Sequence, residues 1–343
     1  MATGQQLFLF RQQLLPAACR LSFTNPAASH PADSPRLILE FELKILGSAS
    51  ATPFMDRHHT AQVLTVGNTP YLIDCGEDTQ RRLMEHKIRH QRIQTIFISH
   101  LHGDHFFGLF GLLGTMHLNG RTEPLRLFGP PGLDEVLTAQ FRHSYTHLSF
   151  ELEFTPVDTT QHVQVFEDKN LTVHTLPMRH RIPCCGYLFR EKPKRRRLLP
   201  DLLPAGLTPQ QLNALTLGDD VRDEQGQLLL QNLSVTQEPK HARSYAYCSD
   251  TLYTESLADL VRGVDLLYHE ATFLDDLRDR ALVTHHSTAR QAGLLARRAE
   301  VHRLLIGHFS SRYRDLQPLL AEAKTMFEWT ELAVEGLSVS VAE

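Results

Sequence analysis

The segment His100-Leu101-His102-Gly103-Asp104-His105 is the most informative stretch of this 343-residue chain. It follows the apolar, β-type run Ile96-Phe97-Ile98 and precedes the Gly-rich apolar segment 106–113. These flanks predict a strand that ends at the segment and a helix that begins after it. Imidazole and carboxylate groups are good metal ligands, so a turn that gathers four of them predicts a metal centre.

The spacing within this segment suits two ions. His100 and His102 are two positions apart on an extended segment and point to the same side, whereas Asp104 and His105 lie further round the turn. Imidazole with carboxylate favours zinc, with manganese and iron as competitors. The alternative is a surface cluster in a chain with 20 histidines, but an acidic member at a strand end argues against it.

Two ions need more ligands, and three isolated residues occupy the same local context as the first segment. His180 follows the run 171–176, Asp250 ends the run 244–249, and His308 ends the run 304–307. Open sheets of layered α/β proteins place their chemistry at the carboxyl ends of such strands. Taken singly, each has a plain alternative: a solvated loop residue, a helix N-cap and a core histidine, respectively.

The coarse pattern alternates strands with helices in two halves and predicts an α/β fold. We expect strands at residues 41–46, 62–66, 71–73, 95–98, 125–128, 151–154, 163–166 and 171–176, and in the second half at 244–248, 266–270 and 303–306. We expect helices at 77–86, 106–118, 132–139, 257–261, 287–299 and 316–327.

The His-x-His-x-Asp-His turn, followed by isolated His, Asp and His residues, resembles the metallo-β-lactamase superfamily. His269-Glu270-Ala271-Thr272-Phe273 and His286-Ser287-Thr288-Ala289-Arg290 narrow the resemblance to ribonuclease Z, the tRNA 3′-processing endonuclease. The resemblance runs from about residue 41 to near the C-terminus. It implies a four-layered αβ/βα sandwich with an inserted protruding arm, so we divide the chain into an N-terminal extension (1–39) and one domain (40–343).

The resemblance also implies a ligand set for two Zn²⁺ ions per subunit. One ion would be held by His100, His102 and His180, the other by Asp104, His105 and His308, with Asp250 bridging them. Asp74 would hydrogen-bond a ligand histidine and fix its tautomer. Its alternative is an ordinary turn aspartate before Gly76.

Two ions about 4 Å apart share a water, lower its pKa and deliver hydroxide to a phosphodiester. Asp104 would orient that nucleophile, and His286, held and charged by Glu270, would protonate the leaving ribose 3′-oxygen. The resemblance thus implies a zinc-dependent endoribonuclease that removes the 3′ trailer from precursor tRNA and leaves a 3′-hydroxyl. Without it, Glu270 is a surface acid and His286 a polar residue at a helix N-terminus.

A basic run lies between two of the predicted ligands, at residues 192–197. It supplies Lys192, Lys194, Arg195, Arg196 and Arg197. This run fits the family's arm, expected at about 190–235, which would bind RNA phosphates in a salt-dependent way. A solvated charge run in a loop is the alternative.

Composition is consistent with a single intracellular enzyme. The chain is 42% hydrophobic and 22% charged, with a formal charge of −4, which argues against a protein that coats nucleic acid over its whole surface. Five cysteines without a CxxC pair favour a reducing compartment, so we expect a cytoplasmic protein. A homodimer is expected by analogy with the family alone.

Two segments depart from the family pattern. Residues 1–39 lack a membrane span and a signal peptide, so we expect a disordered extension, with an Arg-containing, acid-poor transit peptide as the alternative. In the family's Pro-x-Lys-x-Arg-Asn loop, Met55 and His58 here replace the lysine and asparagine, which leaves discrimination against CCA-ending tRNA open.

Two other functions stay open at this point. One is a small-molecule phosphodiesterase or arylsulfatase of the same superfamily, which the basic run argues against. The other is a noncatalytic RNA-binding module whose metals only stabilise the fold. A full set of seven ligands together with Glu270 and His286 argues against such a degenerate site.

Overall fold

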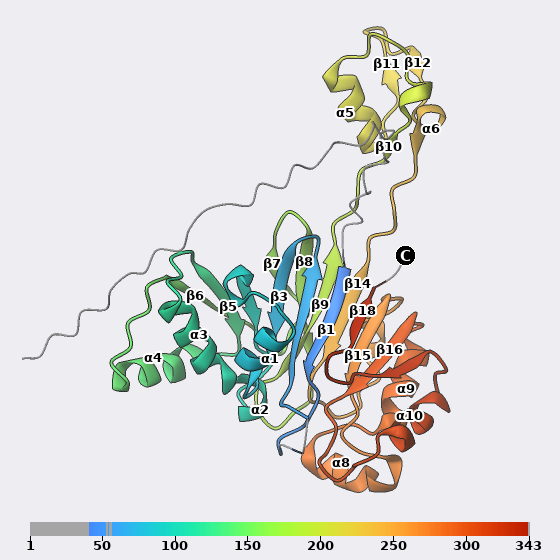
Figure 1. Ribbon diagram of the computed structural model, residues 1–343. Coiled ribbons are helices and arrows are strands. Elements are labelled where there is room, and N and C mark those ends of the chain that lie inside the picture. Colours follow the sequence, from blue (N-terminus) through green and yellow to red (C-terminus); the bar gives the residue numbers. More distant parts are fainter. Residues whose placement is uncertain (1–40, 53, 55–56, 342–343) are drawn as a thin grey trace, which may run out of the picture. The chain divides into compact units, whose positions relative to one another are not determined.

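The computed structural model describes residues 41–341 except 53, 55 and 56 (Figure 1). Two seven-stranded sheets form its framework. The first has the order β18 (Ser338–Ser340), β1 (Phe41–Gly47), β2 (Ala61–Val66), β3 (Thr69–Ile73), β4 (Thr95–Phe97), β5 (Leu125–Gly129) and β6 (Leu152–Pro156). The second has the order β17 (Thr330–Leu332), β16 (Arg303–Gly307), β15 (Leu266–Glu270), β14 (Ser244–Cys248), β9 (Cys185–Glu191), β8 (Leu171–Pro177) and β7 (Gln164–Glu167).

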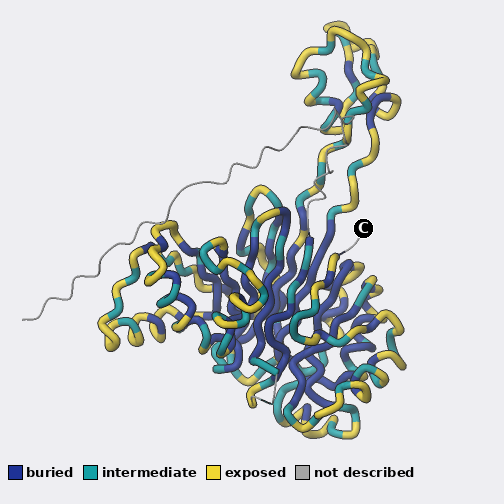
Figure 2. The backbone as a smooth tube through the Cα atoms, in the orientation of Figure 1, coloured by how far each residue is buried: buried dark blue, intermediate teal, exposed yellow. Residues whose placement is uncertain are grey.

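The two sheets pack face to face through an aromatic core. The Phe97 ring of β4 packs against Tyr187 and Phe189 of β9, tilted to the first and edge-to-face with the second, at centroid distances of 5.1 and 5.3 Å. Along β14, Tyr245 and Tyr247 enter this core, while the residues between and after them turn to the outer face. Both faces are therefore buried, which is why the strands appear in the sequence as continuous apolar runs (Figure 2).

Helices cover the outer face of each sheet. The first sheet packs against α1 (Thr79–Glu85), α3 (Gly108–Leu118) and α4 (Leu133–His143). The second packs against α7 (Leu257–Leu260), α9 (Ala289–Arg298) and α10 (Gln317–Lys324). The order helix, sheet, sheet, helix confirms the predicted αβ/βα sandwich. Two short helices, α2 (Gly103–Phe106) and α8 (Arg278–Thr284), lie at one end of the sheets (Figure 1).

An arm leaves the second sheet between β9 and β14, which pair antiparallel. It contains β10 (Arg197–Leu198), α5 (Pro209–Leu217), β11 (Val221–Arg222), β12 (Leu228–Leu230), α6 (Asn232–Val235) and β13 (Thr236–Gln237). Its small core of Leu215, Val221 and Val235 is separate from the cores of the sheets. The arm lies at the opposite end of the sheets from α8 (Figure 1).

Some expectations fall outside the described residues. The N-terminal extension 1–39 does, as do residues 53, 55 and 56 of the altered loop. Within the described residues, no helix combines the length and apolar character needed to cross a membrane.

Candidate metal centre and active site

The predicted site residues meet at the carboxyl ends of strands from both sheets. Asp74 follows β3, His100 follows β4, His180 follows β8, Asp250 follows β14, Glu270 ends β15 and His308 follows β16. Asp74 and His308 have positive φ angles of 53° and 60°, an uncommon conformation for residues other than glycine. Such backbone outliers cluster at functional sites, where the surrounding structure enforces them.

Close backbone contacts fix the turn that carries the first four ligands. Cys75 donates its N–H to the carbonyl of His105 at 2.7 Å, and Gly108 donates to the carbonyl of Cys75 at 2.9 Å. A Cβ added at Gly108 would lie 2.0 Å from the carbonyl oxygen of Gly76. Glycine at 108 therefore lets the start of α3 approach the β3 turn, which places Asp104 and His105 toward the second sheet.

The first group of possible metal ligands contains His100, His102, His180 and Asp250. The His102 Nδ1 atom lies 3.1 Å from the Nε2 atoms of both His100 and His180. The Oδ2 atom of Asp250 lies 3.6 Å from His100 Nε2 and 3.9 Å from His180 Nε2.

The second group contains Asp104, His105, Asp250 and His308. The His308 Nε2 atom lies 3.3 Å from both His105 Nε2 and Asp104 Oδ2. The other oxygen of Asp250, Oδ1, lies 3.2 Å from His308 Nε2 and 3.4 Å from His105 Nε2. Asp250 thus turns one oxygen to each group.

These spacings fit metal ions. Bonds of about 2.0–2.1 Å in a tetrahedron separate neighbouring ligand atoms by about 3.3–3.4 Å, close to the separations found here. Asp250 Oδ1 is buried and has no hydrogen-bond partner among the described residues, as expected of an oxygen reserved for a cation.

The ring nitrogens that face away from the centre have partners that fix the histidine tautomers. His105 Nδ1 lies 2.7 Å from Asp74 Oδ2, and His180 Nδ1 lies 3.0 Å from the carbonyl oxygen of His285. Because these oxygens accept only, each Nδ1 carries the proton and each Nε2 presents a lone pair to the centre. The Nε2 lone pairs therefore converge, an arrangement that a cation stabilises.

Hydroxyl groups extend this support to two further histidines. Ser99 Oγ donates to Asp74 at 2.8 Å and lies 3.0 Å from His100 Nδ1. Thr272 Oγ1 donates to Glu270 Oε2 at 2.7 Å and lies 2.9 Å from His308 Nδ1. In each case the hydroxyl donates to a carboxylate, so it accepts from the histidine.

The electrostatics of the site also favour bound cations. Burial lowers the pKa of His100, and it lowers the pKa of His180 to about 4, so these rings are neutral ligands. Burial alone would disfavour a charge on His105 as well, but the carboxylates of Asp250, Asp104 and Asp74 raise its pKa well above the usual value. Positive charge is thus favoured in the second group.

Glu270 and His286 form a buried pair beside the two groups. His286 Nδ1 lies 2.9 Å from Glu270 Oε1. Burial opposes the charge on His286, but the carboxylates of Glu270 and Asp250 raise its pKa to about 9. Glu270 also accepts from the backbone N–H groups of Thr251 and Thr272, at 3.0 and 3.1 Å, which holds its carboxylate in place.

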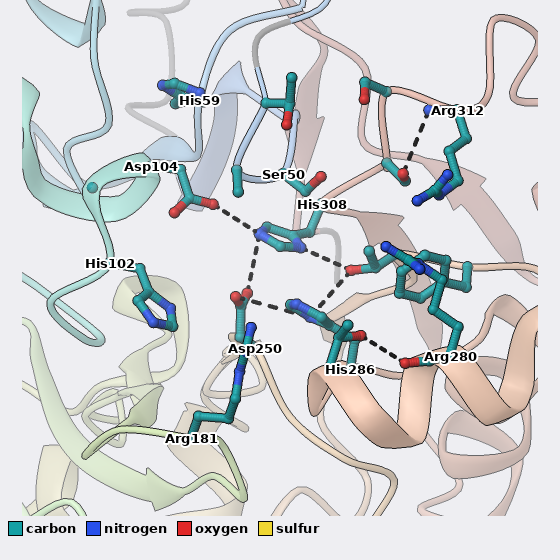
Figure 3. A pocket seen from close by; sticks show the side chains of 18 of the residues that line it. Ser50, His59, His102, Asp104, Arg181, Asp250, Arg280, His286, His308 and Arg312 are labelled. Carbon is teal, nitrogen blue, oxygen red and sulfur yellow. Dashed lines mark hydrogen bonds and ion pairs between the residues drawn. The ribbon is translucent and has the colours of Figure 1, made fainter.

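A cavity of about 710 Å³ opens over the centre (Figure 3). Its wall includes Asp104, Asp250, His286 and His308, and it also includes three arginines: Arg181, Arg280 and Arg312. None of these guanidinium groups forms an ion pair with a described residue. Unpaired arginines around buried acids and histidines suit a substrate that carries several phosphates.

The predicted RNA-binding cations lie at the root and start of the arm, away from this cavity. Three of them have acidic partners: Lys192 with Glu167 at 2.5 Å, Lys194 with Glu191 at 3.1 Å, and Arg196 with Glu238 at 2.5 Å. Arg195 donates to the Asn213 side chain, and Arg197 has no ion-pair partner among the described residues.

Sequence reasoning missed the supporting residues of the centre. Tyr247 donates to Asp74 Oδ2 at 2.6 Å, and Thr272 and Ser99 link carboxylates to ligand histidines. Ser99 directly precedes His100, which is a usable signal. No sequence signal points to the role of Tyr247, because this role depends on Asp74, 173 positions away.

Comparisons with known proteins agree with this fold. The family model described as Anti-Pycsar protein Apyc1 matches residues 41–196. The metallo-β-lactamase fold protein YhfI from Bacillus subtilis superposes with a TM-score of 0.63 at 18% identity, over 88% of this chain and 99% of that one. The short form of human tRNase Z also has a TM-score of 0.63, at 27% identity, over 88% of this chain and 100% of that one.

The fold and the site define a metal-dependent hydrolase of the metallo-β-lactamase class. Ribonuclease Z from Cytophaga hutchinsonii is 48% identical over 305 residues, which cover 89% of this chain and 97% of that protein. Ribonuclease Z from Bacteroides fragilis is 42% identical over 303 residues, with 88% and 99% covered. The chain belongs to the ribonuclease Z family.

Proposed function

We propose that the chain is a two-zinc endoribonuclease that cleaves the 3′ trailer from precursor tRNA. The observation that carries the proposal is the convergence of seven side chains into two groups that share Asp250, with Glu270 and His286 beside them. The names of the relatives, ribonuclease Z and tRNase Z, support the choice of substrate.

The residues present fit two zinc ions. His100, His102 and His180 would hold one, Asp104, His105 and His308 would hold the other, and Asp250 would bridge them. When bound, such ions lower the pKa of a shared water and neutralise charge on the phosphate oxygens. Asp74 and Thr272 keep the ligand histidines in the required tautomer.

The remaining chemistry belongs to side chains of the cavity. Asp104 orients the attacking water oxygen toward phosphorus. As the bond from phosphorus to the ribose 3′-oxygen breaks, His286 gives its proton to that oxygen. Glu270 keeps His286 charged beforehand. The tRNA therefore leaves with a 3′-hydroxyl, and the trailer leaves with a 5′-phosphate.

The arm and the assembly complete the proposal. Lys192, Lys194, Arg195, Arg196 and Arg197 bind RNA phosphates, and those with acidic neighbours exchange them for phosphate when RNA arrives. The enzyme works as a homodimer in the cytoplasm, where precursor tRNA is processed. Sedimentation at micromolar concentration tests the dimer, and a monomer at all concentrations would contradict it.

The test combines metal analysis with cleavage of precursor tRNA by the full-length protein. We expect two zinc ions per chain and one cut, mapped by end analysis to the start of the trailer. His286→Ala should lower kcat by about 10²–10⁴-fold because the leaving oxygen loses its proton donor, while both metals stay bound.

The matched control is His302→Ala, since His302 is a surface histidine paired with Asp265. It should cleave at the wild-type rate. Wild-type protein that binds precursor tRNA but hydrolyses only a chromogenic phosphodiester would contradict the proposal, as would full activity of His286→Ala.

A further inference from the structure

A second cavity, of about 320 Å³, adjoins the cavity over the metal centre at His286. His286 lines both cavities. The wall of the second cavity also includes Arg179, Arg278, Leu252, Leu282 and Tyr253. Its volume is within the range of small-ligand sites, about 300–1,000 Å³.

Two pairs of arginines connect the cavities. Arg179 and Arg278 line the second cavity, and Arg181 and Arg280, two positions further along the chain in each case, line the first. None of the four guanidinium groups has an ion-pair partner within the described part of the chain. Cations in both cavities suit a polyanion that passes from one cavity to the other.

The rest of the wall suits a nucleoside. Leu252 and Leu282 offer apolar surface, and the side chain of Leu282 stands 62% exposed. The hydroxyl of Tyr253 is buried without a hydrogen-bond partner among the described residues, so it has donor and acceptor capacity to spare. The carboxylate of Asp279, also in the wall, accepts hydrogen bonds from ribose hydroxyls or exocyclic amino groups.

The position of His286 sets the direction of the strand. Under the proposed function, on which this step rests, His286 protonates the ribose 3′-oxygen that leaves. That ribose belongs to the nucleotide on the 5′ side of the cut. We propose that the second cavity binds this nucleotide, with Arg179 and Arg278 on its phosphate, while the trailer stays in the cavity over the metal centre.

The test uses two neighbouring variants of α8 in the zinc-loaded, full-length enzyme. Leu282→Glu puts a carboxylate into the second cavity, whereas Val283→Glu places the same charge on a residue that lines neither cavity and is 75% exposed. We expect kcat/KM for precursor tRNA to fall by about tenfold in Leu282→Glu through lost base contact and repulsion, and to change by less than about twofold in Val283→Glu.

An abasic nucleotide then identifies what the cavity holds. Removing the base on the 5′ side of the cut should lower kcat/KM of the wild type by about tenfold but that of Leu282→Glu by less than about threefold, because the contact is already lost. Removing the first trailer base should lower kcat/KM of the wild type and of Leu282→Glu by the same factor. Equal activity of the two glutamate variants, or coupling to the trailer base instead, would overturn the inference. No cleavage of precursor tRNA by wild type and Val283→Glu alike would overturn the proposed function and this inference with it.

Discussion

Asp74 shows how much of the centre depends on one buried carboxylate. Its Oδ2 atom accepts from His105, Ser99 and Tyr247, and its Oδ1 atom accepts from the Ser99 N–H at 2.7 Å. Through these contacts it positions the ligands His105 and His100, which belong to different ion groups. One side chain therefore orients histidines of both groups of possible metal ligands.

Asp74→Asn should weaken metal binding without changing any ligand. An amide has one acceptor oxygen, so either the Ser99 N–H at the Oδ1 position or the three donors at the Oδ2 position would face an N–H group. We expect metal affinity to fall by about 10–100-fold, measured by competition with a chelator. Asp158→Asn is the control because Asp158 is an exposed turn residue whose hydrogen-bond partner among the described residues is Thr160. Equal chelator resistance in wild type and Asp74→Asn would contradict this role.

At this scale, the sequence identifies site residues that are adjacent in the chain, but not those that come together only in the fold. The ligand turn 100–105 can be read directly, because its four ligands are adjacent and follow an apolar run. His180, Asp250 and His308 are recognisable only because each ends such a run. The unpaired arginines of the two cavities give no signal, since pairing depends on acids that the fold brings near or keeps away.

Most strands of both sheets could be predicted, including the edge strands β6 and β7, whereas one central strand and the opposite edge of each sheet could not. β9 was missed because its run starts with two cysteines and a glycine and follows Pro183, so the segment resembles a loop. β17 and β18 are edge strands of three residues, too short for a periodic pattern. The helix predicted at 106–118 begins at Gly108, as α3. Phe106 belongs instead to the short helix α2, which the ligand turn forms and which ends before Phe107.

The root of the arm is held by a buried ion pair at the ends of β9 and β14. The Arg243 guanidinium lies 2.7 Å from Glu191 Oε1 and 2.8 Å from Glu191 Oε2. Burial alone would raise the pKa of Glu191, but hydrogen bonds from Arg243 hold it below the usual value. The folded state therefore binds this proton less readily than the unfolded state does.

Glu191→Gln should destabilise the protein in a pH-dependent way. At neutral pH the substitution takes the carboxylate away from a buried guanidinium, which should lower the unfolding free energy by about 3 kcal/mol. The contribution of Glu191 is fully present above its unfolded pKa of about 4.3 and is lost as the pH falls through the lower, folded value. The difference from wild type in denaturant unfolding should thus shrink below about pH 4.

Glu167→Gln is the matched control because Glu167 pairs with Lys192 at the surface. It should change the free energy of unfolding by less than about 1 kcal/mol at any pH. If Glu191→Gln changes the free energy of unfolding as little as Glu167→Gln does, or by the same amount in acid as at neutral pH, the buried pair does not stabilise the arm root.

The arm as an element has its own core, so it should be separable from the rest. Replacing residues 192–238 by a short glycine-rich linker removes the arm elements and the five predicted RNA-binding cations, while the core clusters of both sheets stay intact. We expect an unchanged melting temperature and retained hydrolysis of a small phosphodiester, but a KM for precursor tRNA raised by about tenfold and less sensitive to salt. An unchanged KM would place the main RNA contacts elsewhere.

On the scale of the whole molecule, the proposed metal centre takes its residues from both sheets. His100 to His105 come from the first sheet, and His180, Asp250 and His308 come from the second. The Nε2 atoms of His105 and His308, one from each sheet, lie 3.3 Å apart, the separation expected of two ligands on one ion. We therefore expect metal binding to do more than prepare chemistry, because an ion bound by both rings would link the halves of the sandwich.

Metal removal should accordingly loosen the contact between the sheets. A ligand at about 100 times its Kd stabilises a folded protein by about 2.7 kcal/mol, so chelation should lower the melting temperature by several degrees and zinc should restore it. Hydrogen exchange should rise first at the carboxyl ends of β4, β14 and β16, where the ligands lie. Asp250→Ala removes the residue shared by both groups, so its melting temperature should respond little to zinc. If chelation leaves the wild-type melting temperature and exchange unchanged, the centre does not join the sheets.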